Sequence, residues 1–351
     1  MIENWKSIVV TPEYSIRDSW KLLDRGGSRF IVVVDNEYRL IGVVTDGDIR
    51  RGLLSGRELG DHIETIMSRK PIVASLKNSK RDLIELMERH SVLALPLVDD
   101  GRLVGVVELQ KLLQVPVVEN PVFIMAGGFG TRLRPLTDTC PKPMLQIGGQ
   151  PLLETLVKSF KRRGFKNFFI STHYLPEAIR EHFNDGSALG VRISYVHEKE
   201  PLGTGGALGL LPNSMPDLPL VMINGDILTS VDFSAFLDFH SKAGADATIC
   251  VRSHEVTIHY GVIEGGDTDI VSMVEKPTYR YFINTGIYAV SPVIYRAVKP
   301  GTVIDMPTLL RQQMQKGLNV SKMPSYDYWL DIGRMDDFYR AQQDIHILGL
   351  L

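Results

Sequence analysis

Cysteine, net charge and long apolar runs are all scarce in this sequence, and each shortage excludes a class of protein. Two of the 351 residues are cysteine, Cys140 and Cys250, which is too few for a disulfide framework or a structural zinc cluster. The formal net charge is −2, so no overall basic field attracts nucleic acid or an acidic membrane surface. No apolar run approaches the roughly 18 residues that span a bilayer. We expect no secretory signal, because the opening residues MIENWKSIVV lack a basic segment followed by an apolar run. We therefore expect a cytoplasmic protein that binds neither membrane nor nucleic acid.

The length and an internal repeat predict two domains. A chain of 351 residues is longer than a domain with one ordinary hydrophobic core. The segment RFIVVVDNEYRLIGVVTDGDI (29–49) aligns with LALPLVDDGRLVGVVELQKL (93–112). Each copy predicts two strands and a helix, and an amphipathic helix precedes each copy, at 15–25 and at 79–90. One copy is too small to bury its own sheet face, so we expect the two copies to pack together.

A short, stiff linker bounded by Pro116 and Pro121 separates this repeat from the rest of the chain. The next apolar strand opens a second region at Val122. The expected domains are a paired domain at 1–117, with repeats at about 1–60 and 61–117, and a second domain at 118–351.

Strands and helices alternate in the second domain. The expected elements are strands at 122–126, 167–172, 192–197 and 219–224 and helices at 151–163, 176–185 and 204–211. This order predicts an α/β fold with a mixed, mostly parallel sheet, covered on both faces, and with ligand loops at the carboxyl ends of the strands. Shorter strands follow at 246–252, 260–264, 270–275 and 284–290, and then helices at 305–316 and near 334–347. We expect this later, antiparallel portion to cap the pocket and to bind a second substrate.

A glycine loop follows the first strand of the second domain, in the stretch FIMAGGFGTRLRPLTDTCPKPM (123–144). Glycine lets backbone N–H groups approach a polyphosphate without a Cβ in the way. Cations and a hydroxyl stand at the same loop, and an ordinary strand-to-helix turn is the alternative for the glycines alone. The residues concerned are Gly127, Gly128, Gly130, Thr131, Arg132 and Lys142. The loop is neither a Walker loop nor a dinucleotide fingerprint, because GxxxxGK[ST] is absent and Leu133 replaces the third glycine.

Taken whole, G-G-x-G-T-R-L-x-P-L-T followed by P-K-P-M resembles the signature of the sugar-phosphate nucleotidyltransferases. The resemblance implies a Rossmann-like α/β/α domain that transfers a nucleoside monophosphate from a nucleoside triphosphate to a sugar 1-phosphate and releases pyrophosphate. It also implies roles for cations: Arg132 would stabilise the leaving pyrophosphate, and Lys142 and Lys276 would stabilise the reacting phosphates.

Two carboxylates are candidate magnesium ligands. Asp226 closes the apolar strand PLVMINGD, and Asp331 lies in the later stretch YWLDIG. Two carboxylates and a triphosphate suit Mg²⁺, which takes oxygen ligands and shares them with phosphates. Both positions match the acidic residues that hold the metal in the resembled family. A turn after a strand is the alternative for Asp226.

A second glycine-rich loop, EKEPLGTGGA, carries the candidate base contacts Glu198, Gly203 and Thr204. Gly203 and Thr204 match the family's base-contacting motif, and a helix N-cap is the alternative for Thr204. An ionised carboxylate only accepts hydrogen bonds, and guanine alone presents two adjacent donors to it, so Glu198 favours GTP. A solvated loop acid is the alternative for Glu198. The positions that match the family's sugar-phosphate contacts are Gly261, Glu275, Lys276 and Asn284.

The first domain resembles a CBS-domain pair, a regulatory module that binds adenosine-type nucleotides. Residues 42–48, GVVTDGD, match the family's G-h-h-T-x-x-D, in which the hydroxyl of Thr45 and the carboxylate of Asp48 would face phosphate and ribose. A helix N-terminal acid is the alternative for Asp48. Glu108 and Lys111 replace this pair in the second copy, so we expect one working site at most. CBS pairs commonly associate, and a homo-oligomer is therefore expected.

The arrangement as a whole resembles guanylyltransferases that make GDP-linked amino sugars for legionaminic acid-type surface glycans. That resemblance favours a GDP-sugar product, with glucosamine 1-phosphate as one acceptor. The enzymatic alternatives are a uridylyltransferase, a thymidylyltransferase and a mannose-1-phosphate guanylyltransferase. The alternative from another class is a catalytically silent nucleotide sensor.

Overall fold

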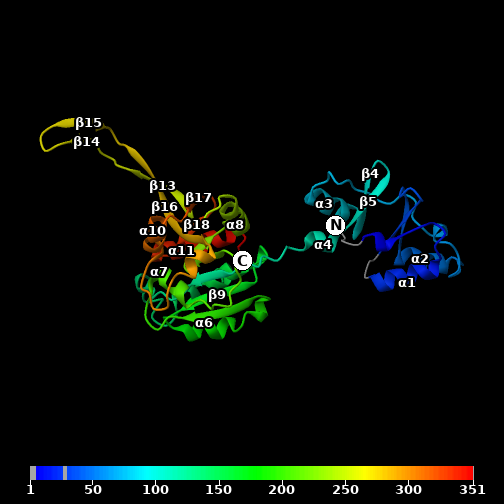
Figure 1. Ribbon diagram of the computed structural model, residues 1–351, viewed down its shortest axis with the longest axis horizontal. Coiled ribbons are helices and arrows are strands. Elements are labelled where there is room, and N and C mark those ends of the chain that lie inside the picture. The colour runs from blue at the N-terminus through cyan, green and yellow to red at the C-terminus, as the bar shows by residue number, and fades with distance from the viewer. Residues whose placement is uncertain (1–4, 27–29, 351) are drawn as a thin grey trace. The chain divides into compact units, whose positions relative to one another are not determined.

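A computed structural model describes residues 5–26 and 30–350, and the chain divides into two units, Met1–Val115 and Pro116–Leu351 (Figure 1). The division lies beside the boundary expected at residues 117 and 118. No helix within the described ranges has both the length and the apolar character that a bilayer crossing requires.

The first unit contains the two repeats. The first repeat consists of η1 (Trp5–Ile8), β1 (Val9–Val10), α1 (Ile16–Gly26), β2 (Phe30–Val34), β3 (Leu40–Thr45) and α2 (Asp46–Leu54). The second consists of η2 (Ile63–Thr65), α3 (Lys80–His90), β4 (Ala94–Asp99), β5 (Arg102–Glu108) and α4 (Leu109–Leu113). Strands β1, β2 and β3 form one sheet, and β4 pairs with β5. The helices α1 and α3 confirm the two amphipathic helices that the sequence predicts.

The two repeats share a core, which explains why one copy does not suffice. All five residues of β2 are buried, so both faces of this strand need cover. Ile31 and Val33 pack in a cluster drawn mostly from the first repeat. Phe30 and Val32 pack in a cluster that also contains Leu103, from β5 of the second repeat. Burial of both faces thus requires both copies.

The second unit is built on a seven-stranded sheet in the order β10-β9-β6-β11-β16-β13-β17. Its strands are β6 (Val122–Met125), β9 (Asn167–Thr172), β10 (Arg192–His197), β11 (Leu220–Asn224), β13 (Ala247–Thr257), β16 (Thr278–Val290) and β17 (Val320–Pro324). Neighbouring strands run parallel except at the β11–β16 and β16–β13 pairs. The sheet is therefore mixed and mostly parallel, as the strand and helix order predicts.

Alternate residues of the central strands pack on opposite faces of this sheet. Val122 and Ile124 belong to one buried cluster, and Phe123 belongs to another. The helices that cover the faces or close the domain are α5 (Leu152–Arg162), α6 (Pro176–Phe183), α8 (Phe233–Lys242), α9 (Pro292–Tyr295), α10 (Met306–Gln315) and α11 (Met335–Ile347). Shorter pieces are η3 (Thr131–Leu133), η4 (Lys142–Met144), β7 (Gln146–Ile147), β8 (Gln150–Pro151), η5 (Ser187–Leu189), β12 (Ile227–Thr229) and β18 (Trp329–Asp331). Strands buried on both faces explain the near-continuous apolar runs in the sequence.

The prediction of one continuous helix at 204–211 is wrong. The structure has a single α-turn, α7 (Gly203–Gly206), followed by the 3-10 helix η6 (Ala207–Leu210). Glycine is a poor helix former, and this segment is glycine-rich because its backbone lies against another loop. A Cβ at Gly206 would stand 2.1 Å from the carbonyl oxygen of Thr302.

Two of the later strands, β13 and β16, are longer than the sequence predicts, and they lead into an arm that Figure 1 shows standing out from the sheet. Pairing of β13 with β16 continues outward to Thr257 and Thr278. A separate two-stranded sheet, β14 (Val262–Gly265) with β15 (Ile270–Val274), follows at its end. We call residues 252–283 the arm, its paired base (252–257 and 278–283) the stem, and residues 258–277 the tip.

Candidate functional site

A pocket of about 270 Å³ lies where β6 and β11 end. These strands are parallel neighbours with Met125 opposite Asn224, so the loops that follow them leave the same edge of the sheet. The lining residues are Met125, Gly127, Gly128, Phe129, Lys142, Pro143, His173, Glu198, Pro201, Gly203, Thr204, Asn224, Asp226 and Asp305. The structure thus brings together both glycine loops and one of the two predicted metal-binding aspartates.

The three glycines of the glycine loop meet three different structural requirements. A Cβ at Gly127 would lie 3.2 Å from both Glu198 Oε1 and His173 Cβ, so glycine allows close packing there. Gly130 has φ +64° and leads into η3, which holds Thr131 and Arg132. A Cβ at Gly128 would meet no heavy atom of the described chain within 4 Å. Gly128 therefore presents open backbone to the pocket.

Lys142, Asp226 and Asp331 form one charged cluster. Lys142 is mostly buried, and its ammonium group donates to Asp226 Oδ2 and lies 3.9 Å from Asp331 Oδ1. Strand pairing brings the two acids together, because Ile227 lies opposite Asp331 in the β12–β18 pair. Burial, and next the charge of Asp226, raise the pKa of Asp331, whereas Lys142 and Arg132 oppose that rise. Two carboxylates and two cations therefore share one small region.

Two buried oxygens in this region lack a hydrogen-bond partner within the described ranges, Asp226 Oδ1 and Asn224 Oδ1. A buried acceptor without a donor is costly, and a cation relieves that cost. Carboxylate and amide oxygens are ligands that Mg²⁺ accepts beside phosphate oxygens. No cluster of three or more His, Cys, Asp or Glu side chains suited to a metal occurs in the described part of the chain. The donor set therefore fits an ion shared with a phosphate-bearing substrate. Sequence reasoning missed Asn224, although it lies in the same N-G-D turn.

Glu198 is buried in the pocket wall, with 4% of its surface exposed. The alternative that it is a solvated loop acid is therefore wrong. Its Oε1 accepts a hydrogen bond from the Ser171 hydroxyl, and its Oε2 accepts from the Leu202 N–H at 3.0 Å. A carboxylate has about four acceptor positions, so each oxygen keeps one for a ligand. Glu198 thus fastens its loop to β9 as well as facing the pocket.

Thr204 caps a helix distant in sequence. Its Oγ1 accepts a hydrogen bond at 2.9 Å from the N–H of Met306, the first residue of α10. Asp305 precedes that residue and lines the pocket. The N-cap alternative for Thr204 is therefore correct in that its hydroxyl caps a helix, but the helix is α10 and not its own. A contact of Thr204 with the base stays a prediction. Sequence reasoning also missed Phe129, His173 and Asp305, although His173 directly follows β9.

The predicted sugar-phosphate residues lie in two separate places in the structure. Asn284 lies in β16 directly after the stem, where its side chain accepts from the Gly286 N–H at 3.0 Å and donates to the Tyr288 hydroxyl at 2.6 Å. Gly286 packs against Asn224, since a Cβ there would lie 2.5 Å from Asn224 Nδ2. Gly261, Glu275 and Lys276 lie in the tip, and none of them is among the described residues that line the pocket.

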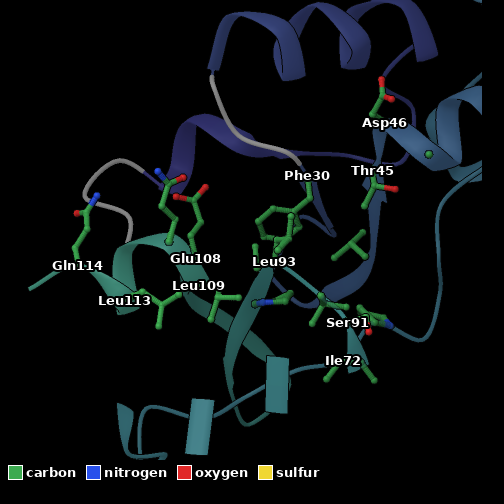
Figure 2. Close-up of a pocket in the computed structure, with 17 residues that line it drawn as sticks. Phe30, Thr45, Asp46, Ile72, Ser91, Leu93, Glu108, Leu109, Leu113 and Gln114 are labelled. Atoms are coloured by element: carbon green, nitrogen blue, oxygen red, sulfur yellow. The ribbon is translucent and has the colours of Figure 1, made fainter. Parts of the chain in front are cut away.

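A second cavity, of about 780 Å³, lies within the first unit, and Figure 2 shows its lining side chains. Thr45, at the end of β3, and Glu108, at the end of β5, both line it. Apolar lining comes from both repeats, including Phe30 and Leu93. The cavity therefore sits between corresponding ends of the two copies.

The Asp48 side chain takes part in the N-terminal cap of helix α2. Its carboxylate accepts from the Thr45 N–H at 2.8 Å, from the Thr45 hydroxyl at 2.6 Å and from Arg51 at 2.6 Å. The Asp48 N–H in turn donates to Thr45 Oγ1, which completes a capping box. Asp48 is not among the described residues that line the cavity, so its contact with a ligand stays a prediction.

Comparisons with known proteins agree on both units. The family described as "Nucleotidyl transferase" matches residues 122–347, and the CBS domain matches residues 2–55 and 63–118. A mannose-1-phosphate guanylyltransferase of Mycobacterium tuberculosis is 33% identical over 232 residues, 63% of each chain. A UTP–glucose-1-phosphate uridylyltransferase of Synechocystis is 32% identical over 237 residues, 62% of this chain and 61% of the relative. This chain thus spans less than two thirds of the length of these relatives.

Solved structures resemble the second unit. The crystal structure of HddC from Yersinia pseudotuberculosis superposes with a TM-score of 0.51 at 27% identity, over 64% of this chain and 99% of that one. The same protein complexed with GMP-PN gives a TM-score of 0.51 at 26% identity over the same shares.

Proposed function

This chain belongs to the nucleotidyl transferase family, and on that premise we propose that it transfers a nucleoside monophosphate from a nucleoside triphosphate to a sugar 1-phosphate. The observation that carries the proposal is the buried Oδ1 of Asp226, which has no hydrogen-bond partner among the described residues and lies beside Lys142, at the edge of the sheet where the glycine loop opens. That oxygen suits a cation held between the protein and the phosphates of a substrate.

Transfer in this pocket needs positioning and charge neutralisation. A phosphate oxygen of the sugar 1-phosphate forms a bond to the α-phosphorus, the bond from that phosphorus to the bridging β-oxygen breaks, and pyrophosphate leaves with the electron pair. The backbone of Gly128 is open to the triphosphate, and Arg132 neutralises the leaving pyrophosphate. Lys142, which pairs with Asp226, neutralises the reacting phosphates in this proposal. Asp226 and Asp331 would hold Mg²⁺, which supplies charge neutralisation at the phosphates when bound.

We further propose that the nucleotide is GTP and the product a GDP-sugar. Glu198 lines the pocket and keeps acceptor positions for the two donors of guanine. The M. tuberculosis relative named as a guanylyltransferase, and HddC complexed with GMP-PN, support a guanine base. The Synechocystis relative named for UTP keeps uridylyl transfer as the competing outcome.

Pyrophosphate release tests the activity and the base together. Full-length protein is incubated with Mg²⁺, each of GTP, UTP and dTTP, and each of glucosamine, mannose and glucose 1-phosphates. We expect release with at least one sugar, fastest with GTP, and no release after chelation of the metal. Turnover with UTP or dTTP ahead of GTP would contradict the base assignment alone. An absence of turnover with every pair would favour the silent nucleotide sensor.

We also propose that the cavity of the first unit binds a regulatory nucleotide through Thr45. Its volume of about 780 Å³ is within the range of small-molecule sites, and its lining combines apolar side chains with a few polar groups. A bound nucleotide changes turnover if it binds two states of the enzyme unequally.

A further inference from the structure

Glu108 brings a carboxylate to the wall of the cavity in the first unit. It is half-buried, and it directly precedes α4 without capping that helix through its side chain. No hydrogen bond or ion pair joins this side chain to another described residue. A carboxylate in a partly apolar wall is stabilised by a ligand that brings hydrogen-bond donors. Glu108 therefore indicates which part of a ligand lies beside it.

Two amide side chains from the segment that follows Glu108 also line the cavity. Gln110 belongs to α4, and Gln114 directly follows that helix. Neither amide has a side-chain hydrogen bond to a described residue. A glutamine can donate as well as accept, whereas an ionised carboxylate only accepts. This part of the wall thus offers the two acceptor oxygens of Glu108 together with donors.

The other side of the cavity suits the phosphate of a nucleotide. Figure 2 shows Thr45 and Glu108 on opposite sides of the cavity, with Phe30 between them. A Cβ at Gly47 would lie 3.5 Å from Thr45 Oγ1 and 3.2 Å from Arg51 Nη1, so a guanidinium stands beside Thr45. The described lining residues themselves include no lysine, arginine or histidine. A nucleotide with its phosphate at Thr45 therefore extends its base past Phe30 toward Glu108.

The hydrogen-bonding edge of guanine matches these side chains better than that of adenine. Guanine presents two adjacent donors, N1–H and the N2 amino group, next to the acceptor O6. The two oxygens of Glu108 accept from both donors, and the amide of Gln110 or Gln114 can donate to O6. Adenine presents the acceptor N1 beside its N6 amino group, so N1 would meet a carboxylate oxygen acceptor to acceptor. Glu108 therefore favours guanine.

We propose that the cavity of the first unit selects a guanine nucleotide and that Glu108, in the second repeat, contacts the base. This inference rests on the proposed binding of a regulatory nucleotide through Thr45. It departs from the adenosine-type ligand that the sequence favours, and it gives the second repeat a part in binding. The regulatory ligand then carries the same base as the proposed GTP substrate and GDP-sugar product.

Hydrogen exchange followed by mass spectrometry tests this selection in the full-length protein without turnover. Peptides that cover residues 109–114 report the cavity, and peptides that cover 127–133 report the transferase pocket separately. No residue of α4 is buried, so a bound ligand should slow exchange there. The probes are GMP and AMP, which differ in the base alone. We expect GMP to protect residues 109–114 at a concentration about tenfold or more below that required of AMP.

Glu108→Gln should weaken protection by GMP and strengthen protection by AMP, because a glutamine amide matches the N6 donor and N1 acceptor of adenine. Glu88→Gln is the matched control. It replaces an exposed acid of α3 that is absent from the described cavity lining, and it should leave both nucleotides unchanged.

Three results would overturn the proposal, and they differ in what else they affect. Protection by AMP at lower concentrations than GMP in wild type would refute the choice of guanine and leave the regulatory site standing. Equal losses with GMP and AMP in Glu108→Gln would place the ribose, and not the base, at Glu108. An absence of protection at residues 109–114 with both nucleotides would contradict the proposed regulatory site itself.

Discussion

Two acidic residues at the pocket, Asp226 and Asp331, are in environments that disfavour a negative charge, and a bound cation would offset that cost. Asp226 gives one oxygen to Lys142 and keeps the other buried without a partner in the described chain. Asp331, 49% exposed at its side chain, has a raised pKa because burial and the charge of Asp226 disfavour its ionised form. A divalent cation between the two acids would reverse both penalties.

Asp226→Asn and Asp331→Asn are each expected to lower the rate of pyrophosphate release by a factor on the order of 10² or more, since each removes a charge that we propose holds the metal. The measurement is kcat at saturating Mg²⁺, together with the Mg²⁺ concentration that gives half the maximal rate. Asp336→Asn, an exposed acid in the first turn of α11, is the matched control and should leave both values unchanged. Near-normal, magnesium-dependent turnover in either site variant would remove that residue from the metal site.

Glu198→Gln is expected to lower kcat/KM for GTP by roughly 10- to 100-fold and to improve the use of UTP relative to GTP. An amide group would turn donors toward either the Leu202 N–H or guanine, where Glu198 has acceptors. The measurement is kcat/KM for GTP and for UTP in wild type and Glu198→Gln. Glu200→Gln, at an exposed position, is the control. An equal loss with GTP and UTP would limit Glu198 to fastening its loop.

At the scale of elements, helix α8 is tied to the sheet by a buried histidine. His240 is 2% exposed, and its ring nitrogens lie 2.9 Å from Thr248 Oγ1 in β13 and 3.1 Å from Ser291 Oγ after β16. Burial lowers the pKa of His240, and the charge of Asp246 opposes that shift without cancelling it. The neutral ring is therefore the form that joins helix to sheet.

This lowered pKa predicts an acid-sensitive fold. Below about pH 6.5, the unfolded chain protonates His240 while the folded chain resists, so the free energy of unfolding falls with falling pH by at most about 1.4 kcal/mol per pH unit. Above that pH the contribution is fully present. Urea unfolding at pH 7.5 and 5.5 should show a smaller pH effect in His240→Gln than in wild type. Exposed His346→Gln should behave as wild type, and an unchanged pH effect in His240→Gln would refute the assignment.

At the scale of the whole molecule, a cavity in one unit and a pocket in the other are joined by one chain. Regulation across that connection requires the ligand of the first unit to bind unequally to two states of the enzyme. A matched pair of helix caps in the first unit makes this testable. Thr45 with Asp48 caps α2, and Ser79 with Asp82 caps α3 in the same way.

Thr45→Val is expected to weaken nucleotide binding to the full-length protein and to abolish the effect of that nucleotide on turnover. Ser79→Ala removes an equivalent capping hydroxyl, worth about 1 kcal/mol, that is absent from the described cavity lining. Calorimetry with adenine and guanine nucleotides, at a fixed GTP analogue concentration that fills the transferase pocket, compares the two variants. Equal weakening in both would show that only helix stability matters, and no binding by wild type would leave the first unit structural.

The repeat, the alternation of strands and helices and the glycine loop can all be read from the amino-acid sequence. Each of these depends on residues a few positions apart, through side-chain periodicity and the backbone freedom of glycine. Tertiary structure alone decided which distant groups meet. Lys142 contacts Asp226 across 84 positions, and Thr204 caps a helix 102 positions away. Strand order and register also set the partners of Glu198, the outward course of the arm and the burial of Asn224 Oδ1, which has no hydrogen-bond partner in the described ranges. Short-range patterns carry neither strand order nor register.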